Sequence, residues 1–261
     1  MDGPITTTAR TTPTAALVVI GDEILSGKTA DTNTPFAVAE LRALGVAVRR
    51  ITVVPDEVDA IVDELRRARE RHDYVFTSGG VGPTHDDVTI QAVARALARP
   101  VVRSEEIVRA MHALWQPVKE THLRMADVPE GAELLYGRGL RFPVIRVENI
   151  YVLPGVPEIF REKLVSLRET LRSAPFHLTR VFSSYGEGRL APLMEQVVAA
   201  HRGVSVGSYP TLTAPDHRVL VTFESKEEAA VAAAVEAFVA LVGAAGVVRV
   251  ERAAADVVQQ P

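Results

Sequence analysis

The sequence predicts an α/β domain of three layers with a mainly parallel sheet, followed by a small α+β domain. Short continuous apolar runs alternate with segments of helical period, and the pattern changes character after about residue 174. Alternation of this kind implies right-handed crossovers and a sheet that is covered by helices on both faces. We expect the first domain at residues 15–174, the second at 175–250, and disordered tails at 1–14 and 251–261.

The elements of the first domain follow from apolar runs and from helical spacing of apolar residues. Its expected strands are 15–21, 46–54 and 73–80, followed by a hairpin over 142–157 that turns at Glu148–Asn149. Its expected helices are 31–44, 56–71, 88–97, 104–115 and 158–171, and the stretch 116–141 is expected to be irregular. In the second domain the expected strands lie within 176–186, 203–210 and 217–225, and the expected helices are 187–200 and 226–242.

Composition narrows the class of protein. The 261 residues include no cysteine, which excludes disulfides, thiolate zinc sites and a cysteine nucleophile, and we expect a cytoplasmic protein. The net charge of −4 and the absence of a long basic block argue against nucleic acid as a partner. We expect neither an export signal nor a membrane span, because no run approaches about 18 apolar residues.

Three loops are expected at the carboxyl ends of the parallel strands, where ligands bind in such sheets. They read GDEILSGKTADTN (21–33), VVPDE (53–57) and TSGGVGPTHDD (77–87), and each contains carboxylates. We therefore expect the three loops to meet at one pocket.

The third loop carries the strongest chemical signal. Gly79, Gly80 and Gly82 can turn successive backbone N–H groups toward an anion, whereas the adjacent Asp86 and Asp87 repel an anion unless a cation lies between. A simple strand-to-helix turn with an aspartate cap is the alternative, but capping needs one carboxylate. The loop therefore predicts a metal–phosphate site.

Other polar residues have weaker signals. Asp56 follows a strand and fits a helix cap, yet it leaves the sheet on the side of Asp86 and Asp87 and is expected to complete a cation site. Asp22 and Asp31 are second-rank candidates for substrate binding, with turn and cap roles as the alternative. His85 is either a proton donor or a solvated loop residue.

The segments IGDEILSGKTADTN, VVPDE, TSGGVGPTHDDVT and LPGVPE, in this order, resemble the molybdopterin-binding-like domain of the competence/damage-inducible protein A family. SSYGEGRLAPLME resembles the start of the small KH-like domain of that family. Within this group, RFPVIRVENIYVLPGVPEIFREKL with GSYP is most similar to the N-terminal domain of animal FAD synthases and their free-standing prokaryotic relatives. The stretch GRGLRFPV departs from the Asn-x-x-Gly-x-Ala-Pro-Gly of competence-type members, which argues against a competence-type substrate.

The resemblance implies divalent-metal-dependent hydrolysis of a nucleotide pyrophosphate such as FAD or ADP-ribose. The acidic site residues of more distant, pterin-binding relatives map onto Asp56 and Asp87. Taken together, we expect Mg²⁺, Mn²⁺ or Co²⁺ on Asp56, Asp86 and Asp87, and phosphate on the N–H groups of Gly79, Gly80 and Gly82. Ser78 and Thr84 are expected as auxiliary donors.

Two other functions remain open at this point. One is a pterin-binding or adenylyl-transferring protein of molybdenum cofactor synthesis, and the other is a non-catalytic module that senses a nucleotide. The expected partner is in each case a nucleotide or pterin small molecule, and we expect a homo-oligomer.

Overall fold

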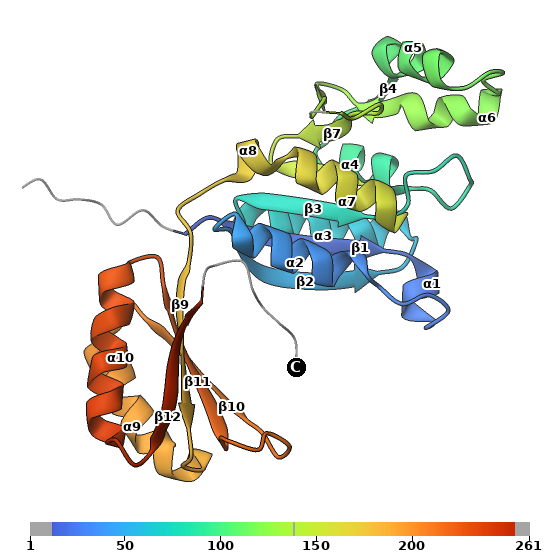
Figure 1. Cartoon of the computed structure of the whole chain (residues 1–261). Coiled ribbons are helices and arrows are strands. Elements are labelled where there is room, and N and C mark those ends of the chain that lie inside the picture. The colour runs from blue at the N-terminus through green and yellow to red at the C-terminus, as the bar shows by residue number, and fades with distance from the viewer. Residues whose placement is uncertain (1–11, 138, 254–261) are drawn as a thin grey trace, which may run out of the picture. The chain divides into compact units, whose positions relative to one another are not determined.

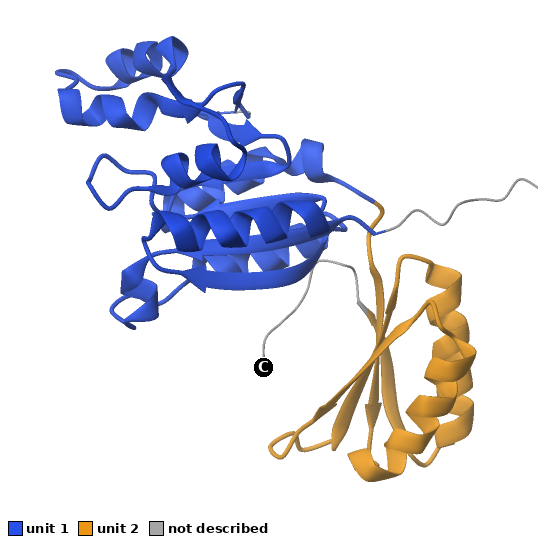
Figure 2. Cartoon of the chain, turned by 180° about the vertical axis from the view of Figure 1, so that it is seen from behind, with its two compact units in different colours: residues 1–173 blue, residues 174–261 orange. Residues whose placement is uncertain are grey.

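The computed structural model describes residues 12–137 and 139–253 and divides into two compact units, residues 1–173 and 174–261 (Figures 1 and 2). Most of the two expected tails, residues 1–11 and 254–261, lies outside the described residues. The inner boundaries of both tails were wrong, because Thr14 begins a strand and residues 251–253 end one. Within the described ranges, none of the helices has the length and apolar character needed to span a bilayer.

The first unit is built on a six-stranded sheet with the order β2-β1-β3-β8-β7-β6. The parallel strands are β1 (Thr14–Ile20), β2 (Ala47–Val54), β3 (Tyr74–Ser78) and β8 (Ile150–Leu153). The strands β7 (Val144–Val147) and β6 (Glu133–Leu135) continue the sheet in antiparallel pairing. The expectation of a mainly parallel sheet is thus confirmed.

Helices cover both faces of this sheet and complete three layers (Figure 1). One face packs against α2 (Asn33–Ala43), α7 (Pro157–Ser166) and α8 (Arg168–Leu171), and the other against α3 (Val58–Arg71) and α4 (Thr89–Ala96). The helix α5 (Glu105–Leu114) adds Ile107 and Met111 to the core on the second side. Alternation along β1 divides the core, because Leu17 packs with the first group and Val18 with the second. Continuous burial of β1 therefore explains its uninterrupted apolar sequence.

The region expected to be irregular, 116–141, contains short elements. These are α6 (Glu120–Leu123), the 3₁₀ turn η1 (Arg124–Ala126), β5 (Asp127–Pro129) and β6. The strand β5 pairs with β4 (Val101–Arg103), and β6 pairs with β7. Strands of three residues have too little periodicity to be recognised in sequence, because distant partners rather than local pattern hold them. Two further differences are a short helix α1 (Asp22–Leu25) after β1 and the break between α7 and α8 at Leu167.

The second unit is an antiparallel sheet with the order β10-β11-β9-β12 and two helices. Its elements are β9 (His177–Ser183), α9 (Glu187–Ala200), β10 (Ser205–Pro210), β11 (Val219–Ser225), α10 (Glu228–Val242) and β12 (Val247–Ala253). Val221, Phe223 and Phe238 lie in its buried core. The strand β12 was not expected, because its end is fixed by pairing with β9 rather than by its own sequence.

Candidate ligand-binding pocket

A cavity of about 1020 Å³ opens at the carboxyl ends of the parallel strands of the first unit. Its wall includes Glu23 after β1, the segment 79–84 after β3 and the segment 154–156 after β8. The chain leaves β1 through α2 on one face of the sheet and leaves β3 through α4 on the other. Such a reversal between neighbouring strands is the place where open α/β sheets bind ligands.

Two glycines in the loop after β3 have backbone conformations that L side chains rarely adopt. The φ angle is 111° at Gly79 and 63° at Gly80. A Cβ added at Gly79 would lie 2.1 Å from the carbonyl oxygen of Ile20, and one at Gly80 would lie 2.4 Å from Thr89 Oγ1. Thr89 fixes the loop further, since its Oγ1 donates to the Gly79 carbonyl at 2.8 Å and its backbone N–H donates to the Gly80 carbonyl at 3.0 Å.

The loop after β8 packs directly on the glycine loop. A Cβ at Gly155 would contact Gly79 Cα at 3.4 Å, so the two backbones nearly touch. Asn33 joins them, because its Nδ2 donates to Ser78 Oγ at 3.0 Å and to the Gly155 carbonyl at 2.8 Å. Ser78 is buried and does not line the cavity. Its hydroxyl therefore accepts the Asn33 hydrogen bond that holds β3 beside the loop after β8, and it is not positioned to contact a ligand.

Asp31 also has a local role. Its Oδ1 accepts hydrogen bonds from the backbone N–H groups of Asn33 and Thr34, both at 3.0 Å, at the start of α2. This is the cap chemistry that the sequence left open as the alternative. Asp31 is not part of the cavity wall.

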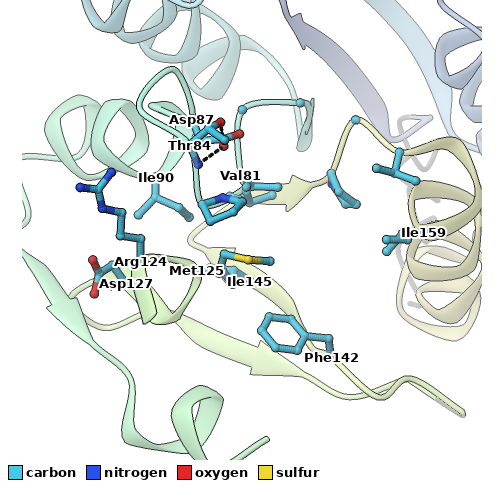
Figure 3. A pocket seen from close by; sticks show the side chains of 18 of the residues that line it. Val81, Thr84, Asp87, Ile90, Arg124, Met125, Asp127, Phe142, Ile145 and Ile159 are labelled. Carbon is cyan, nitrogen blue, oxygen red and sulfur yellow. Dashed lines mark hydrogen bonds between the residues drawn. The ribbon is translucent and has the colours of Figure 1, made fainter. Parts of the chain in front are cut away.

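Asp87 and Thr84 close the tip of the glycine loop at the cavity (Figure 3). Asp87 Oδ2 accepts from the Thr84 backbone N–H at 2.8 Å and from Thr84 Oγ1 at 2.5 Å. Gly82 faces the same carboxylate, because a Cβ there would lie 2.6 Å from Asp87 Oδ2. These three predicted site residues therefore lie together with Gly79 and Gly80 at the cavity.

Asp56 lies beside the loop after β1. Its Oδ2 accepts a hydrogen bond from the Asp22 backbone N–H at 2.8 Å. Burial raises the pKa of Asp56, and the nearby carboxylates of Glu23, Asp22 and Asp86 raise it further, against the Asp22 hydrogen bond, which lowers it. The three loops thus meet, but among these acids Glu23 faces the cavity while Asp22, Asp56 and Asp86 do not.

The tip residues Asp86 and His85 are open to solvent. The Asp86 side chain is 61% exposed and that of His85 is 95% exposed, with His85 Nδ1 and Asp86 Oδ1 3.8 Å apart. Across residues 12–137 and 139–253, no three His, Cys, Asp or Glu side chains are grouped so that they could hold a metal ion. Asp56, Asp86 and Asp87 therefore do not fit a preformed three-carboxylate metal centre, and the divalent cation stays a prediction.

The far side of the cavity consists of residues that the sequence did not indicate. Trp115 and Phe142 stack with ring centroids 6.0 Å apart and an angle of 25° between the ring planes. Arg124 and Asp127 line the same side, and Asp127 Oδ1 accepts from Arg103 Nε at 2.8 Å. Arg124 and Asp127 lie in the stretch 116–141 that was expected to be irregular, whereas Trp115 ends the expected helix 104–115 and Phe142 begins the expected hairpin. No local pattern marks these four residues as part of a ligand site.

Lys163 is a further wall residue, and it is buried with 8% of its surface exposed. Its Nζ donates to the Pro143 carbonyl and lies 5.6 Å from the centre of the Phe142 ring. Burial lowers the pKa of Lys163 to about 8. A sequence signal for it does exist, since Lys163 follows Phe160 by three residues and therefore shares the apolar face of α7.

A parallel sheet with a glycine loop and a cavity at its switch point defines an α/β protein that binds a small molecule. Comparison with known families narrows this class. Residues 16–173 match the family described as "Probable molybdopterin binding domain", and residues 175–251 match "FAD synthase, middle domain". The chain therefore belongs to the family in which a probable molybdopterin binding domain is joined to a FAD synthase middle domain.

Individual proteins and one solved structure are similar to this chain along most of its length or along its first unit. A protein from Archaeoglobus fulgidus is 33% identical over 222 residues, which cover 85% of this chain and 95% of that protein. A probable FAD synthase from Caenorhabditis briggsae is 34% identical across 82% of this chain, but the match spans only 46% of that synthase. The crystal structure of the protein CinA, of unknown function, from Thermoplasma acidophilum is 29% identical, with a TM-score of 0.55 over 60% of this chain and 97% of that one.

Proposed function

We propose that this protein hydrolyses a nucleotide pyrophosphate, such as FAD or ADP-ribose, to two monophosphates. The observation that carries the proposal is the two-sided lining of one cavity. Thr84 and Asp87 of the glycine loop stand on one side and Phe142 on the other, with Met125 and Ile145 between them (Figure 3). A dinucleotide has the matching parts, an anionic pyrophosphate and a flat aromatic ring.

The size of the cavity supports a ligand of this class. Its volume of about 1020 Å³ is at the upper end of the range of roughly 300–1,000 Å³ that small-molecule sites occupy. The N–H group of Gly79 is not available to a ligand, contrary to the expectation from the sequence, because it donates to the Leu153 carbonyl at 3.2 Å. The phosphate donors that we propose are therefore the N–H groups of Gly80 and Gly82, and the absence of a side chain at Gly80 lets a phosphate approach closely. A ligand without an anionic group would leave these donors unused.

The chemistry proposed at this site is the addition of water across the pyrophosphate bridge. The oxygen of water forms a bond to one phosphorus, and the bond from that phosphorus to the bridging oxygen breaks. The bridging oxygen leaves with its electron pair on the second phosphate. We assign the proton of the attacking water to Asp87 Oδ1, because Thr84 holds Oδ2 and thereby orients the carboxylate at the cavity.

Names of relatives support a nucleotide substrate without defining the reaction. Two Caenorhabditis proteins similar to this chain are probable FAD synthases, and the second unit matches a FAD synthase middle domain. This chain spans about half of the length of those synthases, 46% and 47%. The names of the relatives therefore do not support hydrolysis over synthesis. The argument for hydrolysis is our own and is based on the residues that line the cavity.

The test is release of AMP by the purified protein from FAD and from ADP-ribose, with Mg²⁺, Mn²⁺ or Co²⁺ added in turn. We expect multiple turnovers with at least one pairing of substrate and cation. Asp87→Asn is the matched variant, since an amide oxygen preserves the contact with Thr84. Binding of nucleotide with no AMP release under any pairing would leave a nucleotide-sensing module instead.

Binding of a pterin is the second candidate function. It is favoured by the match of residues 16–173 to a probable molybdopterin binding domain and by the stacked rings of Trp115 and Phe142. A fluorescence titration with a pterin separates the two, because tight pterin binding without cleavage of nucleotides supports this candidate. The homo-oligomer belongs to the proposal as well and is tested by light scattering.

A further inference from the structure

The ammonium group of Lys163 has an unusual environment for a charged side chain. It lies in the wall of the cavity, buried on α7, with the Pro143 carbonyl as its hydrogen-bond acceptor and the Phe142 ring nearby. Lysine is almost never buried to this degree unless a counter-charge accompanies it. The Pro143 carbonyl satisfies one of three N–H donors and carries no net charge.

The charges around Lys163 do not neutralise it. Glu162, the neighbouring residue on α7, is the acid that acts on it, and its carboxylate raises the pKa of Lys163 against the larger effect of burial. In the part of the chain that the structure describes, Lys163 forms no salt bridge with Glu162 or with any other acid. Among the described residues, the cavity wall therefore contains a buried cation without a salt-bridge partner.

The helix α7, which carries Lys163, begins directly after the turn that packs on the glycine loop. Residues 154–156 form the turn that touches Gly79 and lead directly into α7, on which Lys163 lies. The glycine loop and Lys163 thus line one cavity from two connected segments. Backbone N–H groups and an ammonium group are the donors that commonly surround a phosphate in proteins.

We propose that Lys163 is a substrate-binding residue whose buried ammonium group pairs with a phosphate of the bound nucleotide. The proposal rests on the proposed function, because it takes the ligand to be a nucleotide pyrophosphate. The bound phosphate supplies the counter-charge that the cavity wall lacks. Binding then favours the protonated lysine, so a proton is taken up when the ligand binds near pH 8.

The experiment compares Lys163→Met with the wild-type protein by titration calorimetry. The probes are inorganic pyrophosphate, ADP-ribose and adenosine, which has the ring but no phosphate. We expect Lys163→Met to weaken pyrophosphate and ADP-ribose at least about tenfold and to leave adenosine unchanged. Arg161→Met is the matched control, because Arg161 is an exposed cation on the same helix whose guanidinium lies over Phe36, outside the cavity.

A second measurement needs no variant. Titrations of the wild-type protein with ADP-ribose, whose phosphates do not titrate near pH 8, in buffers of different ionisation enthalpy report the number of protons bound by the protein. We expect uptake of a fraction of a proton near pH 8 and its loss in Lys163→Met. The same experiment therefore remains informative if Lys163→Met fails to fold.

The outcomes separate this inference from the proposed function. If Lys163→Met binds pyrophosphate as tightly as the wild type, or the wild type takes up no proton, the role of Lys163 is wrong even when AMP is released. If pyrophosphate binding depends on Lys163 but AMP never appears, Lys163 binds phosphate and hydrolysis is wrong. A wild-type protein that binds neither pyrophosphate nor ADP-ribose overturns both.

Discussion

Replacing Lys163 with methionine is expected to stabilise the ligand-free protein at neutral pH, although it weakens phosphate binding. Burial lowers the pKa of Lys163 from 10.5 to about 8, so the folded state holds the lysine proton less tightly than the unfolded chain does. The unfolded chain therefore binds more protons between pH 8 and 10.5, and stability of the wild type rises with pH across this window. Below it, the full penalty of the buried charge is present.

The magnitude follows from the same pKa. One decade in a proton equilibrium is about 1.4 kcal/mol, so a fall from 10.5 to about 8 corresponds to about 3 kcal/mol at pH 7. The hydrogen bond from Nζ to the Pro143 carbonyl offsets about 1 kcal/mol. Methionine fills a similar volume without charge, so Lys163→Met should be more stable by about 2 kcal/mol at pH 7 and by close to nothing at pH 10.

Urea unfolding at pH 7 and pH 10 measures this difference. Trp115 is the single tryptophan of the chain and lies in the first unit, so its fluorescence reports the unit that contains Lys163. The comparison of two variants at each pH removes the contribution of every other titrating group. Arg161→Met should show no change with pH relative to the wild type. A Lys163→Met protein that is no more stable than the wild type at pH 7 would refute the reasoning.

Three further predictions concern the glycine loop and the carboxylates. Asp87→Asn should lower AMP release at least about a hundredfold with little change in melting temperature, and wild-type release rates would contradict the assignment. Gly80→Val should weaken nucleotide binding in calorimetry and lower stability by about 1–3 kcal/mol, since φ is 63° there; unchanged binding would exclude the loop as a phosphate site. Turnover should require Mg²⁺, Mn²⁺ or Co²⁺; undiminished release of AMP in a chelator would contradict the metal requirement.

Local patterns were sufficient for the parallel strands of the first unit and for the glycine loop. The burial of β1 and β3 appears in the sequence as continuous apolar runs, and α9 begins and ends at the expected residues 187–200. Positive φ angles at Gly79 and Gly80 also follow from local sequence, because a tight turn after a buried strand needs such residues. Each of these features depends on neighbours within a few positions.

Features that depend on distant contacts could not be predicted. Ser78 and Asp31 have side chains that suit a ligand, but Asn33 engages Ser78, and the start of α2 engages Asp31. Whether a polar group serves a ligand or its own backbone is decided by what the fold places beside it. Lys163 is the opposite case. Its spacing from Phe160 places it on the apolar face of α7, but a lysine in an amphipathic helix ordinarily indicates the solvent face, and only the structure shows that it is buried.

The two sides of the cavity differ in how firmly the fold holds them. On the side of the glycine loop, Gly155 packs on Gly79, and Asn33 donates to Ser78 Oγ and to the Gly155 carbonyl. Donors fixed by packing and hydrogen bonds need little ordering when a phosphate arrives, so any nucleotide gains from them alike. The ring side belongs to residues 114–142, whose described part is built of short elements after α5, and Trp115 in this segment is 38% exposed. Selection among nucleotides is therefore expected to depend on this segment, and affinity for the shared pyrophosphate on the glycine loop and α7.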